Sequence, residues 1–330
     1  MSSIKNVVYR GVDGALKQVV TDVPKVLGPK QILVKITHSG LCASDLYAIP
    51  YHATLGHEGV GIVEAIGSEV TQFKVGDRAG GGYLRDSCGH CKFCLNGQDI
   101  WCHNRSIFIE SDQSNGTIAD YYIGIETFLH RIPESMSSED AAPLQCAGAT
   151  VYTALVDNIK PGQRVGILGI GGLGHLAIQF AKKLGAEVVV FSTTADKEQE
   201  AMGFGASEFV LASSPEKISK PVDVLVVTGS GNPDWSRFLN KDVITRRGIL
   251  VPLSASDLNL PGLNMFYNGY TVKESMVATR AVHDDMLEFA ARHTIKPTIE
   301  KFELSSSGLA AAIEKLKSGK MRYRAVLTAA

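Results

Sequence analysis

The chain has 330 residues, 45% of them hydrophobic and 20% charged, and its 33 basic and 34 acidic residues leave a formal net charge of −1. This balance excludes recognition of nucleic acid or of an anionic membrane by bulk charge, and the length favours two domains. The first residues lack the apolar core of a secretory signal, so we expect a cytoplasmic protein. In that compartment clustered cysteines bind metal more often than they form disulfides.

The first part of the chain, up to about residue 135, is predicted to consist of short β segments. They are separated by Gly, Pro and Asp turns, as in the segments 31–40 (QILVKITHSG), 59–67 (GVGIVEAIG) and 74–82 (KVGDRAGGG). Short apolar runs with this punctuation are typical of an irregular, largely antiparallel β domain.

From about residue 150, strand-like and helix-like patterns alternate. The apolar, strand-like segments are RVGILGI (164–170), EVVVFS (187–192), PVDVLVVTG (221–229) and RRGILVPL (246–253). The segments with helical spacing are GGLGHLAIQFAKKLG (171–185) and ADKEQEAMGFG (195–205). This alternation predicts the α/β class, with a parallel sheet covered on both faces. Further along, two helices and a final strand are predicted at 284–293, 306–320 and 322–329.

A glycine-rich loop joins the first of these strands to the first helix, and it contains the pattern Gly169-x-Gly171-x-x-Gly174. This pattern occurs in other α/β turns, but a strand before it and a helix after it favour a dinucleotide site. Its glycines allow the backbone to approach a pyrophosphate, which then faces the helix N-terminus. The predicted cofactor-binding residues of the loop are Gly169, Gly171, Gly172, Leu173 and Gly174.

The end of the second strand distinguishes the two nicotinamide cofactors. An NAD site has an acid there, whereas this chain has Ser192, Thr193 and Thr194. The nearest acid is Asp196, four residues after Ser192, and Lys197 follows it. Hydroxyl donors and a cation suit a 2′-phosphate, which an acid would repel. We therefore predict NADP(H), contacted by Ser192, Thr193 and Lys197. The alternative is a polar turn and helix cap beside a solvated lysine.

Four of the six cysteines lie in one short segment, DSCGHCKFCLNGQDIWCHN, with the spacing C-x2-C-x2-C-x7-C. Four thiolates fill every position of a tetrahedral zinc ion, which leaves none for a substrate. The predicted structural zinc ligands are Cys88, Cys91, Cys94 and Cys102. Only one basic residue, Lys92, lies between the outer cysteines, which argues against the distant alternative of a zinc-binding interaction protein with a nucleic-acid finger.

The other two cysteines, Cys42 and Cys146, are far apart in the sequence. Each alone is as consistent with a small buried apolar residue as with a ligand. Together with His57 they match the Cys₂His set of a catalytic zinc ion, which keeps one coordination position open. The sequence does not show whether the three residues meet in space.

Several stretches resemble, in order and spacing, the zinc-dependent medium-chain alcohol dehydrogenases, and among them the cinnamyl alcohol dehydrogenase branch. They are GLCASDL, GHEGVGIVEAIGSEVTQFKVGDR, DSCGHCKFCLNGQDIWC, APLQCAGATVYTAL, GIGGLGHLAIQFAKKLGAEV, MLEFAARHTIKPTIE and MRYRAVL. The resemblance implies a GroES-like β catalytic domain at residues 1–148 and 286–330, and a doubly wound parallel-sheet Rossmann domain at residues 149–285. It also implies a homodimer.

The resemblance further implies two zinc ions per chain. The catalytic ion would be bound by Cys42, His57 and Cys146, and the structural ion by the four clustered cysteines. Asp45 would orient His57 through its other ring nitrogen, and Glu58 would approach the metal during ligand exchange.

Two more roles follow from the same resemblance. Ser44 would relay a proton between the substrate alcohol and the cofactor ribose, because a hydroxyl can donate one proton while accepting another. Arg324 would reach the cofactor pyrophosphate; the alternative is a surface arginine on a strand.

The chain departs from the family at the end of this proton relay. Many relatives have a His five residues after the first zinc cysteine, where this chain has Tyr47. Tyr47 then substitutes, or protons leave through water, and His52 is a candidate replacement. Only 14 residues separate Cys42 from His57, which is fewer than in the relatives, so we expect an opened or reshaped substrate pocket.

The predicted activity is that of an oxidoreductase: zinc-dependent hydride transfer between NADP(H) and a small primary alcohol or aldehyde. The alternative on the same fold is reduction of a polarised C=C or iminium bond. Ser44, Glu58 and the complete ligand set favour carbonyl chemistry.

Overall fold

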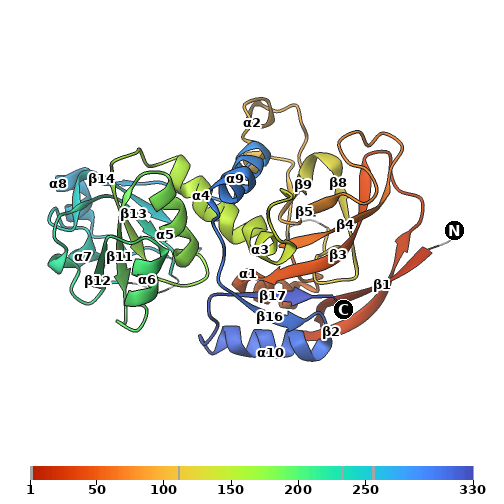
Figure 1. Cartoon of the computed structure of the whole chain (residues 1–330). Helices are drawn as coiled ribbons and strands as arrows, with labels where there is room; N and C mark the ends of the chain where they lie inside the picture. Colours follow the sequence, from red (N-terminus) through yellow and green to blue (C-terminus); the bar gives the residue numbers. More distant parts are fainter. Residues whose placement is uncertain (1–2, 111, 230, 232, 255–256, 330) are drawn as a thin grey trace. The chain divides into compact units, whose positions relative to one another are not determined.

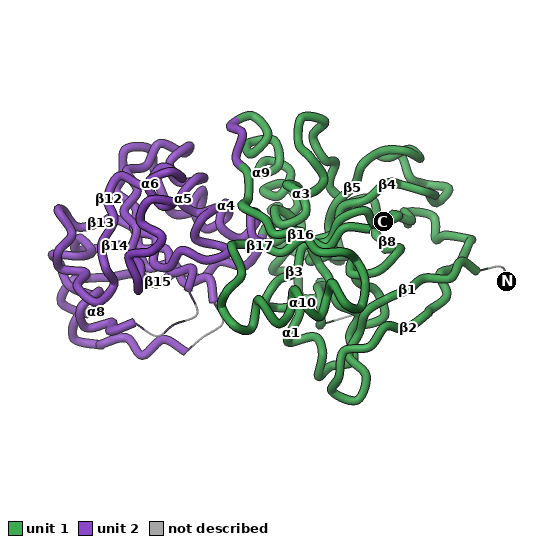
Figure 2. Tube along the Cα trace, turned by 60° about the horizontal axis from the view of Figure 1, so that its bottom comes forward, with its two compact units in different colours: residues 1–146, 278–292, 296–330 green, residues 147–277, 293–295 purple. Residues whose placement is uncertain are grey.

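The structure is a computed structural model that describes residues 3–110, 112–229, 231, 233–254 and 257–329. The chain divides into two compact units, shown in different colours in Figure 2. Unit 1 comprises Met1–Cys146, Ala278–Arg292 and Lys296–Ala330, and unit 2 comprises Ala147–Val277 and His293–Ile295. The assignment of a catalytic and a nucleotide-binding role to residues 1–148 with 286–330 and to 149–285 stays a prediction.

Unit 1 is built on a seven-stranded sheet with the order β16-β17-β3-β4-β5-β9, in which β8 also pairs with β3 (Figure 1). The strands are β3 (Gln31–Leu41), β4 (Gly59–Ile66), β5 (Arg78–Gly81), β8 (Tyr121–Ile125), β9 (His130–Arg131), β16 (Ile299–Glu303) and β17 (Arg324–Thr328). All these pairs are antiparallel except β16 with β17. The predicted antiparallel β domain is therefore confirmed.

Unit 1 also contains two separate antiparallel strand pairs. β1 (Ser3–Val12) pairs with β2 (Ala15–Pro24), and β6 (Leu84–Asp86) pairs with β7 (Ser106–Ile107). Asp13 and Gly14 join the first pair with φ of 52° and 74°. An Asp-Gly pair with positive φ at both residues is the turn that matches the twist of a hairpin.

The helices of unit 1 are mostly short. They are α1 (Ala43–Ala48), η1 (Ile49–Tyr51), α2 (Lys92–Leu95), η2 (Asp99–Trp101), η3 (Glu126–Phe128), α3 (Ser138–Pro143), α9 (Arg280–His293) and α10 (Ser306–Lys317). α10 packs against β16 and β17 (Figure 1), and its buried residues Leu309 and Ala312 join a core cluster with Leu41 and Leu55. The core therefore reaches the end of β3, where the first candidate ligand follows.

Unit 2 is a six-stranded parallel sheet with the order β12-β11-β10-β13-β14-β15. The strands are β10 (Arg164–Leu168), β11 (Glu187–Ser192), β12 (Glu208–Leu211), β13 (Val222–Val227), β14 (Ile244–Pro252) and β15 (Thr271–Val272). Counted along the chain, this order is 3-2-1-4-5-6, which is that of a dinucleotide-binding Rossmann sheet. The predicted α/β class and parallel sheet are confirmed.

The helices of unit 2 are α4 (Ala149–Val156), α5 (Gly174–Lys183), α6 (Glu198–Phe204), η5 (Pro215–Lys217), α7 (Trp235–Phe238) and α8 (Gly262–Asn268). Every residue of β10 is buried, as expected for a central strand of a parallel sheet. Among the described residues, no helix combines the length and the apolar character that a membrane span requires.

Candidate catalytic and structural metal sites

The three scattered residues predicted to bind a metal converge in unit 1. Cys42 follows β3 and is the N-cap of α1, and His57 lies two residues before β4. Because Ser39 pairs with Gly59 in the β3–β4 ladder, these two ligands come from the same end of adjacent strands. Cys146 lies in a π-helix, Leu144–Gly148, a wide turn that often occurs at functional sites. Their ligand atoms and a Glu58 carboxylate oxygen lie within 4.8 Å of one another.

The imidazole of His57 is completely buried, and the buried carboxylate of Asp45 lies next to it. Asp45 Oδ1 lies 3.3 Å from His57 Nδ1, although the two groups are not aligned for a hydrogen bond. The Asp45 carboxylate itself accepts hydrogen bonds of 2.8 Å from the backbone N–H groups of Cys42 and Gly56. His57 Nε2 has no hydrogen-bond partner in the described part of the chain. A buried nitrogen without a partner is costly, and a metal ion would satisfy it.

Two aromatic rings that the sequence did not single out pack against His57. The ring of Phe108 lies 4.3 Å from the imidazole, measured between centroids, and the ring of Tyr83 approaches edge-on at 5.7 Å. Burial and the nearby Cys146 raise the pKa of the Tyr83 hydroxyl above its usual value. Neither residue belongs to a spacing pattern, so sequence reasoning had no signal that would have found them.

The charges of the site are strongly coupled. A hydrogen bond with the Cys146 thiol holds the pKa of Cys42 well below its usual range, and the same contact raises the pKa of Cys146 well above it. Burial lowers the pKa of His57, but Asp45 and Cys42 outweigh it and raise the value to about 10. One thiolate therefore forms readily next to the imidazole, and a metal ion bound there would displace the proton that the raised pKa keeps on His57.

Glu58 is paired with Arg324, the first residue of β17. Arg324 Nη2 donates to Glu58 Oε1, and both side chains are buried. Burial raises the pKa of Glu58 to about 7, although Arg324 acts in the opposite direction. The structure thus places Arg324 beside the candidate catalytic site, and its predicted contact with a pyrophosphate stays a prediction.

The three residues considered for the proton relay have different environments. Ser44 is half-buried, and its Oγ lies 3.6 Å from the Sγ of Cys42. Tyr47 lies on α1 with 70% of its surface exposed. His52 is also exposed and ends η1 with a φ of 57°, while its carbonyl accepts hydrogen bonds from the Arg10 guanidinium. Ser44 is therefore the one of the three that the structure places against a candidate ligand.

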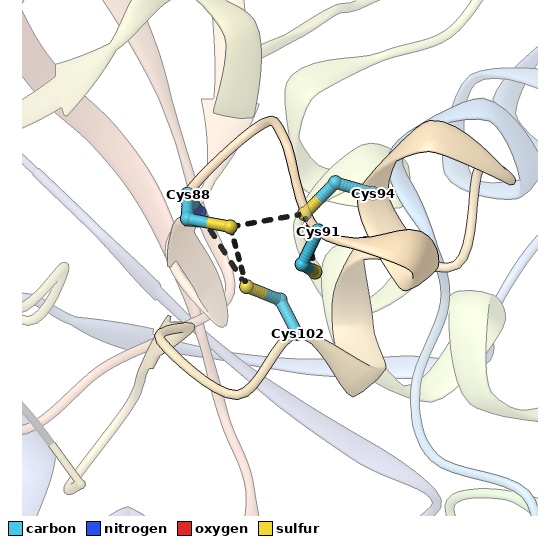
Figure 3. A group of neighbouring side chains, drawn as sticks. All are labelled: Cys88, Cys91, Cys94 and Cys102. Atoms are coloured by element: carbon cyan, nitrogen blue, oxygen red, sulfur yellow. Dashed lines mark hydrogen bonds between the residues drawn. The ribbon is translucent and has the colours of Figure 1, made fainter.

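The four clustered cysteines form a second candidate metal site, in the segment that carries α2 and η2 (Figure 3). Their sulfur atoms lie within 4.8 Å of one another. Cys88 lies 3.5 Å from Cys102 and 4.0 Å from Cys94, and Cys91 lies 3.6 Å from Cys94. Neighbouring ligands of a tetrahedral zinc ion with Zn–S bonds of about 2.3 Å are about 3.8 Å apart. The distances fit this geometry and are far longer than a disulfide bond.

Backbone groups around this second site favour thiolates at Cys88 and Cys91. The backbone N–H of His90 lowers the pKa of Cys88, and that of Cys94 lowers the pKa of Cys91. The backbone N–H of Cys88 also lowers the pKa of Cys102, but burial and the side chains of Cys88 and Cys94 outweigh it and raise the value to about 11. The backbone N–H of Asn104 also points at Cys102 Sγ, at 3.4 Å. The segment thus supplies four converging sulfurs and no open ligand position.

The glycine loop of unit 2 connects β10 to α5. Gly169 has a φ of +100°, which favours glycine, and a Cβ on Gly174 would lie 2.1 Å from the carbonyl oxygen of Gly169. A Cβ on Gly171 would meet nothing within 4 Å. The loop therefore packs tightly on one side and leaves open space on the other, where a pyrophosphate could approach the helix N-terminus.

The residues predicted to contact a 2′-phosphate lie at the end of β11. Ser192 is its last residue and is buried, and its Oγ accepts a 3.4 Å hydrogen bond from the backbone N–H of Thr194. Lys197 Nζ donates to the carbonyl oxygen of Ile170 at 3.0 Å. This contact holds the lysine against the glycine loop. Thr193 is exposed.

Two family models match the chain. One is described as alcohol dehydrogenase GroES-like domain and matches residues 28–134, and the other is described as zinc-binding dehydrogenase and matches residues 172–292. A curated protein of Bacillus subtilis, named probable formaldehyde dehydrogenase, is 33% identical over 318 residues, which cover 91% of this chain and 90% of the relative.

Two solved structures are similar over almost the whole chain. A cinnamyl alcohol dehydrogenase from Sorghum bicolor superposes with a TM-score of 0.89 and 30% identity, and the match covers 98% of both chains. CAD from Helicobacter pylori, complexed with NADP(H), gives a TM-score of 0.88 with 26% identity and covers 99% of both chains.

Proposed function

Because the chain belongs to the zinc-dependent medium-chain alcohol dehydrogenase family, whose cinnamyl alcohol dehydrogenase-like members it resembles, we propose that it interconverts small primary alcohols and aldehydes with zinc and NADP(H). The observation that carries the proposal is that ligand atoms of Cys42, His57 and Cys146 lie within 4.8 Å of one another, while His57 Nε2 is buried and has no hydrogen-bond partner among the described residues. Three ligands from separate elements leave one position of a tetrahedral ion for substrate.

Cys42, His57 and Cys146 would hold the catalytic zinc, and the four clustered cysteines a structural one. The catalytic ion would supply a Lewis acid that polarises a carbonyl oxygen. Two backbone hydrogen bonds hold the Asp45 carboxylate 3.3 Å from His57 Nδ1, where it would orient the ring of the metal ligand. A cytoplasmic homodimer stays our prediction from the sequence.

The proton relay is assigned to Ser44, because its hydroxyl lies beside Cys42 and is half-buried. A hydroxyl can accept the proton of an alcohol while it donates its own to a cofactor ribose. Tyr47 is exposed, so it would take part only at the solvent end of this path. Glu58 remains available to approach the metal during ligand exchange, held by its pair with Arg324.

The preference for NADP(H) is supported by the polar residues around the tip of β11. Ser192 ends the strand where an acid would bind the ribose of NAD, and Lys197 is held against the glycine loop by its bond to Ile170. The Helicobacter pylori structure, which carries NADP(H), shares the fold over 99% of the chain.

The deciding experiment is a substrate panel with NADPH and NADH side by side, before and after removal of zinc by a chelator. We expect aldehyde reduction with NADPH that is lost with zinc and restored when zinc is added back. Equal rates with NADH would contradict the cofactor assignment. Activity on enals or iminium compounds without activity on aldehydes would contradict the carbonyl chemistry and favour reduction of a C=C or C=N bond.

A further inference from the structure

Gln145, the residue directly before the candidate ligand Cys146, has its side-chain amide fixed on three sides. It is buried, and its Nε2 donates to the carbonyl oxygen of Ala141 at 3.1 Å. Its Oε1 lies 3.1 Å from His283 Nε2. Gly80 packs directly against this amide: a Cβ on Gly80 would lie 2.8 Å from Cδ and from Oε1 of Gln145. The π-helix that carries Cys146 is thus anchored one residue before the ligand.

His283 must donate the hydrogen bond to Gln145, because the Oε1 of an amide can only accept. Burial and the neighbouring His130 lower the pKa of His283 well below its usual range, so the ring is neutral with its single proton on Nε2. The His130 ring stacks on it at 3.7 Å, with 8° between the planes, and His130 Nδ1 lies 2.7 Å from Asp284 Oδ1. The stack and the carboxylate restrict the orientation of His283.

His283 belongs to α9, and the first residue of that helix is attached to the four-cysteine segment. The backbone N–H of Arg280 lies 3.4 Å from Asp99 Oδ1, and the Arg280 guanidinium pairs with the same carboxylate. Asp99 is buried and lies between Cys94 and Cys102, in η2. The Arg280 guanidinium also lies over the ring of Phe128, at 4.8 Å. All these residues belong to unit 1 (Figure 2).

We propose that α9 links the two metal sites, and that His283 is a positioning residue for Cys146 that acts through Gln145. The inference rests on the proposed function, since it gives Cys146 the role of a zinc ligand. Asp99 fixes the start of α9 relative to the structural site. His283, one helical turn further along α9, fixes the π-helix that carries Cys146. Without the hydrogen bond from His283, the π-helix loses its anchor and the sulfur atom of Cys146 moves relative to Cys42 and His57.

The test compares two substitutions at one position in the full chain reconstituted with cobalt. His283→Phe keeps a ring that can stack on His130 but removes the N–H donor, whereas His283→Gln keeps a donor at the place of Nε2. Glu288→Gln, on the exposed side of α9, is the matched control. Cobalt is used because its visible absorption bands respond to ligand geometry. The bands of the catalytic site are identified as those present in the wild type and absent from the Cys42→Ser variant. Zinc affinity of each variant is measured by competition with a chelator.

We expect His283→Phe to shift the catalytic-site bands and to weaken zinc binding there about 10-fold, the low end for loss of a group that supports a ligand. The bands of the four-cysteine site should not move. His283→Gln and Glu288→Gln should keep the wild-type spectrum and affinity. A folded His283→Phe variant with unchanged bands would overturn the inference, and so would equal shifts in the Phe and Gln variants.

A second variant covers the case in which His283→Phe does not fold. Gln145→Leu removes the acceptor without touching α9, and the same shift is expected; unchanged bands would again overturn the inference. Failure of the proposed function has a different signature. In that case the cobalt-loaded Cys42→Ser variant would show the same bands as the cobalt-loaded wild type. This result would refute both the catalytic zinc site and its positioning by His283.

Discussion

Arg324 and Glu58 form an ion pair in the interior of unit 1, where their side chains are 7% and 0% exposed. The pair joins the first residue of β17 to the residue before β4, and Cys42, His57 and Cys146 lie around it. The C-terminal strand therefore contributes a charge to the candidate catalytic site. Arg324 Nε and Glu58 Oε2 have no hydrogen-bond partner within the described ranges, so each charge depends on the other.

Replacing Glu58 by Gln should destabilise the protein by about 3–5 kcal/mol, because it leaves the buried guanidinium of Arg324 without its counter-charge. Urea unfolding of the zinc-loaded protein measures the loss. The double variant Glu58→Leu, Arg324→Met should recover most of it, since it removes both charges. A loss below about 1 kcal/mol in Glu58→Gln would show that other groups neutralise the arginine.

Substitution of one cysteine in each metal site should separate stability from turnover. Cys102→Ser removes a sulfur from the four-cysteine site and should cost on the order of 4 kcal/mol or more, since structural zinc contributes directly to folding. Cys42→Ser should leave the protein folded while alcohol oxidation falls to background. Melting curves and rates of both variants, with their zinc content, check the contrast. Equal melting temperatures for the two variants would contradict it.

Replacing Ser192 by Asp should lower the ratio of kcat/KM for NADPH to that for NADH by about 10–100-fold. The acid repels a 2′-phosphate and accepts hydrogen bonds from ribose hydroxyls, and hydrogen bonds to charged groups contribute about 1.5–3 kcal/mol. Ser192→Asn, which has the same size as Asp without the charge, is the control. The prediction is wrong if both variants change the ratio equally.

Acid should destabilise the protein partly through His283. Its pKa is lower in the folded state than the ordinary value of 6.5, because the ring is buried and lies next to His130. Below pH 6.5 the unfolded state therefore binds more protons at this residue than the folded state does. Stability that is fully present above that pH is then lost as the pH falls towards the folded pKa.

The charged and titratable groups that face His283 are His130 and, through it, Asp284. Unfolding free energies at pH 7 and at pH 5 for wild type and His283→Gln check this prediction. The variant should lose less stability between the two values. Parallel losses in both proteins would assign the acid sensitivity to other groups, such as the zinc ligands.

The elements that the sequence predicted correctly are those with a strong local signal. β11 spans the predicted residues 187–192, and α5 and β10 lie on either side of the glycine loop as expected. α9 begins at Arg280, four residues before the predicted start, because its first turn is held by Asp99 rather than by an apolar pattern. β15 has two residues and α7 has four, which is too short for any periodicity to appear.

The candidate site likewise contains residues that the sequence singled out and contacts that it did not indicate. The sequence singled out Cys42, His57 and Cys146 because each lies in a recognisable motif, and the three lie together in unit 1. Their role as zinc ligands stays a prediction. The hydrogen bond between His283 and Gln145 joins residues 138 positions apart, and neither has a spacing that indicates a partner. Contacts of this kind depend on the packing of α9 in three dimensions, which no short motif records.

The division of the chain into units has a consequence for its synthesis on the ribosome. Unit 2 is almost continuous in the sequence, whereas unit 1 is completed only by residues that are translated after it. Until β17 emerges, the end of β3 from His38 to Leu41 lacks its antiparallel neighbour, and an unpaired strand edge is prone to wrong pairings. Cys42 follows directly on that edge. The nascent chain therefore carries its candidate catalytic ligands in an unfinished sheet until β17 has been made.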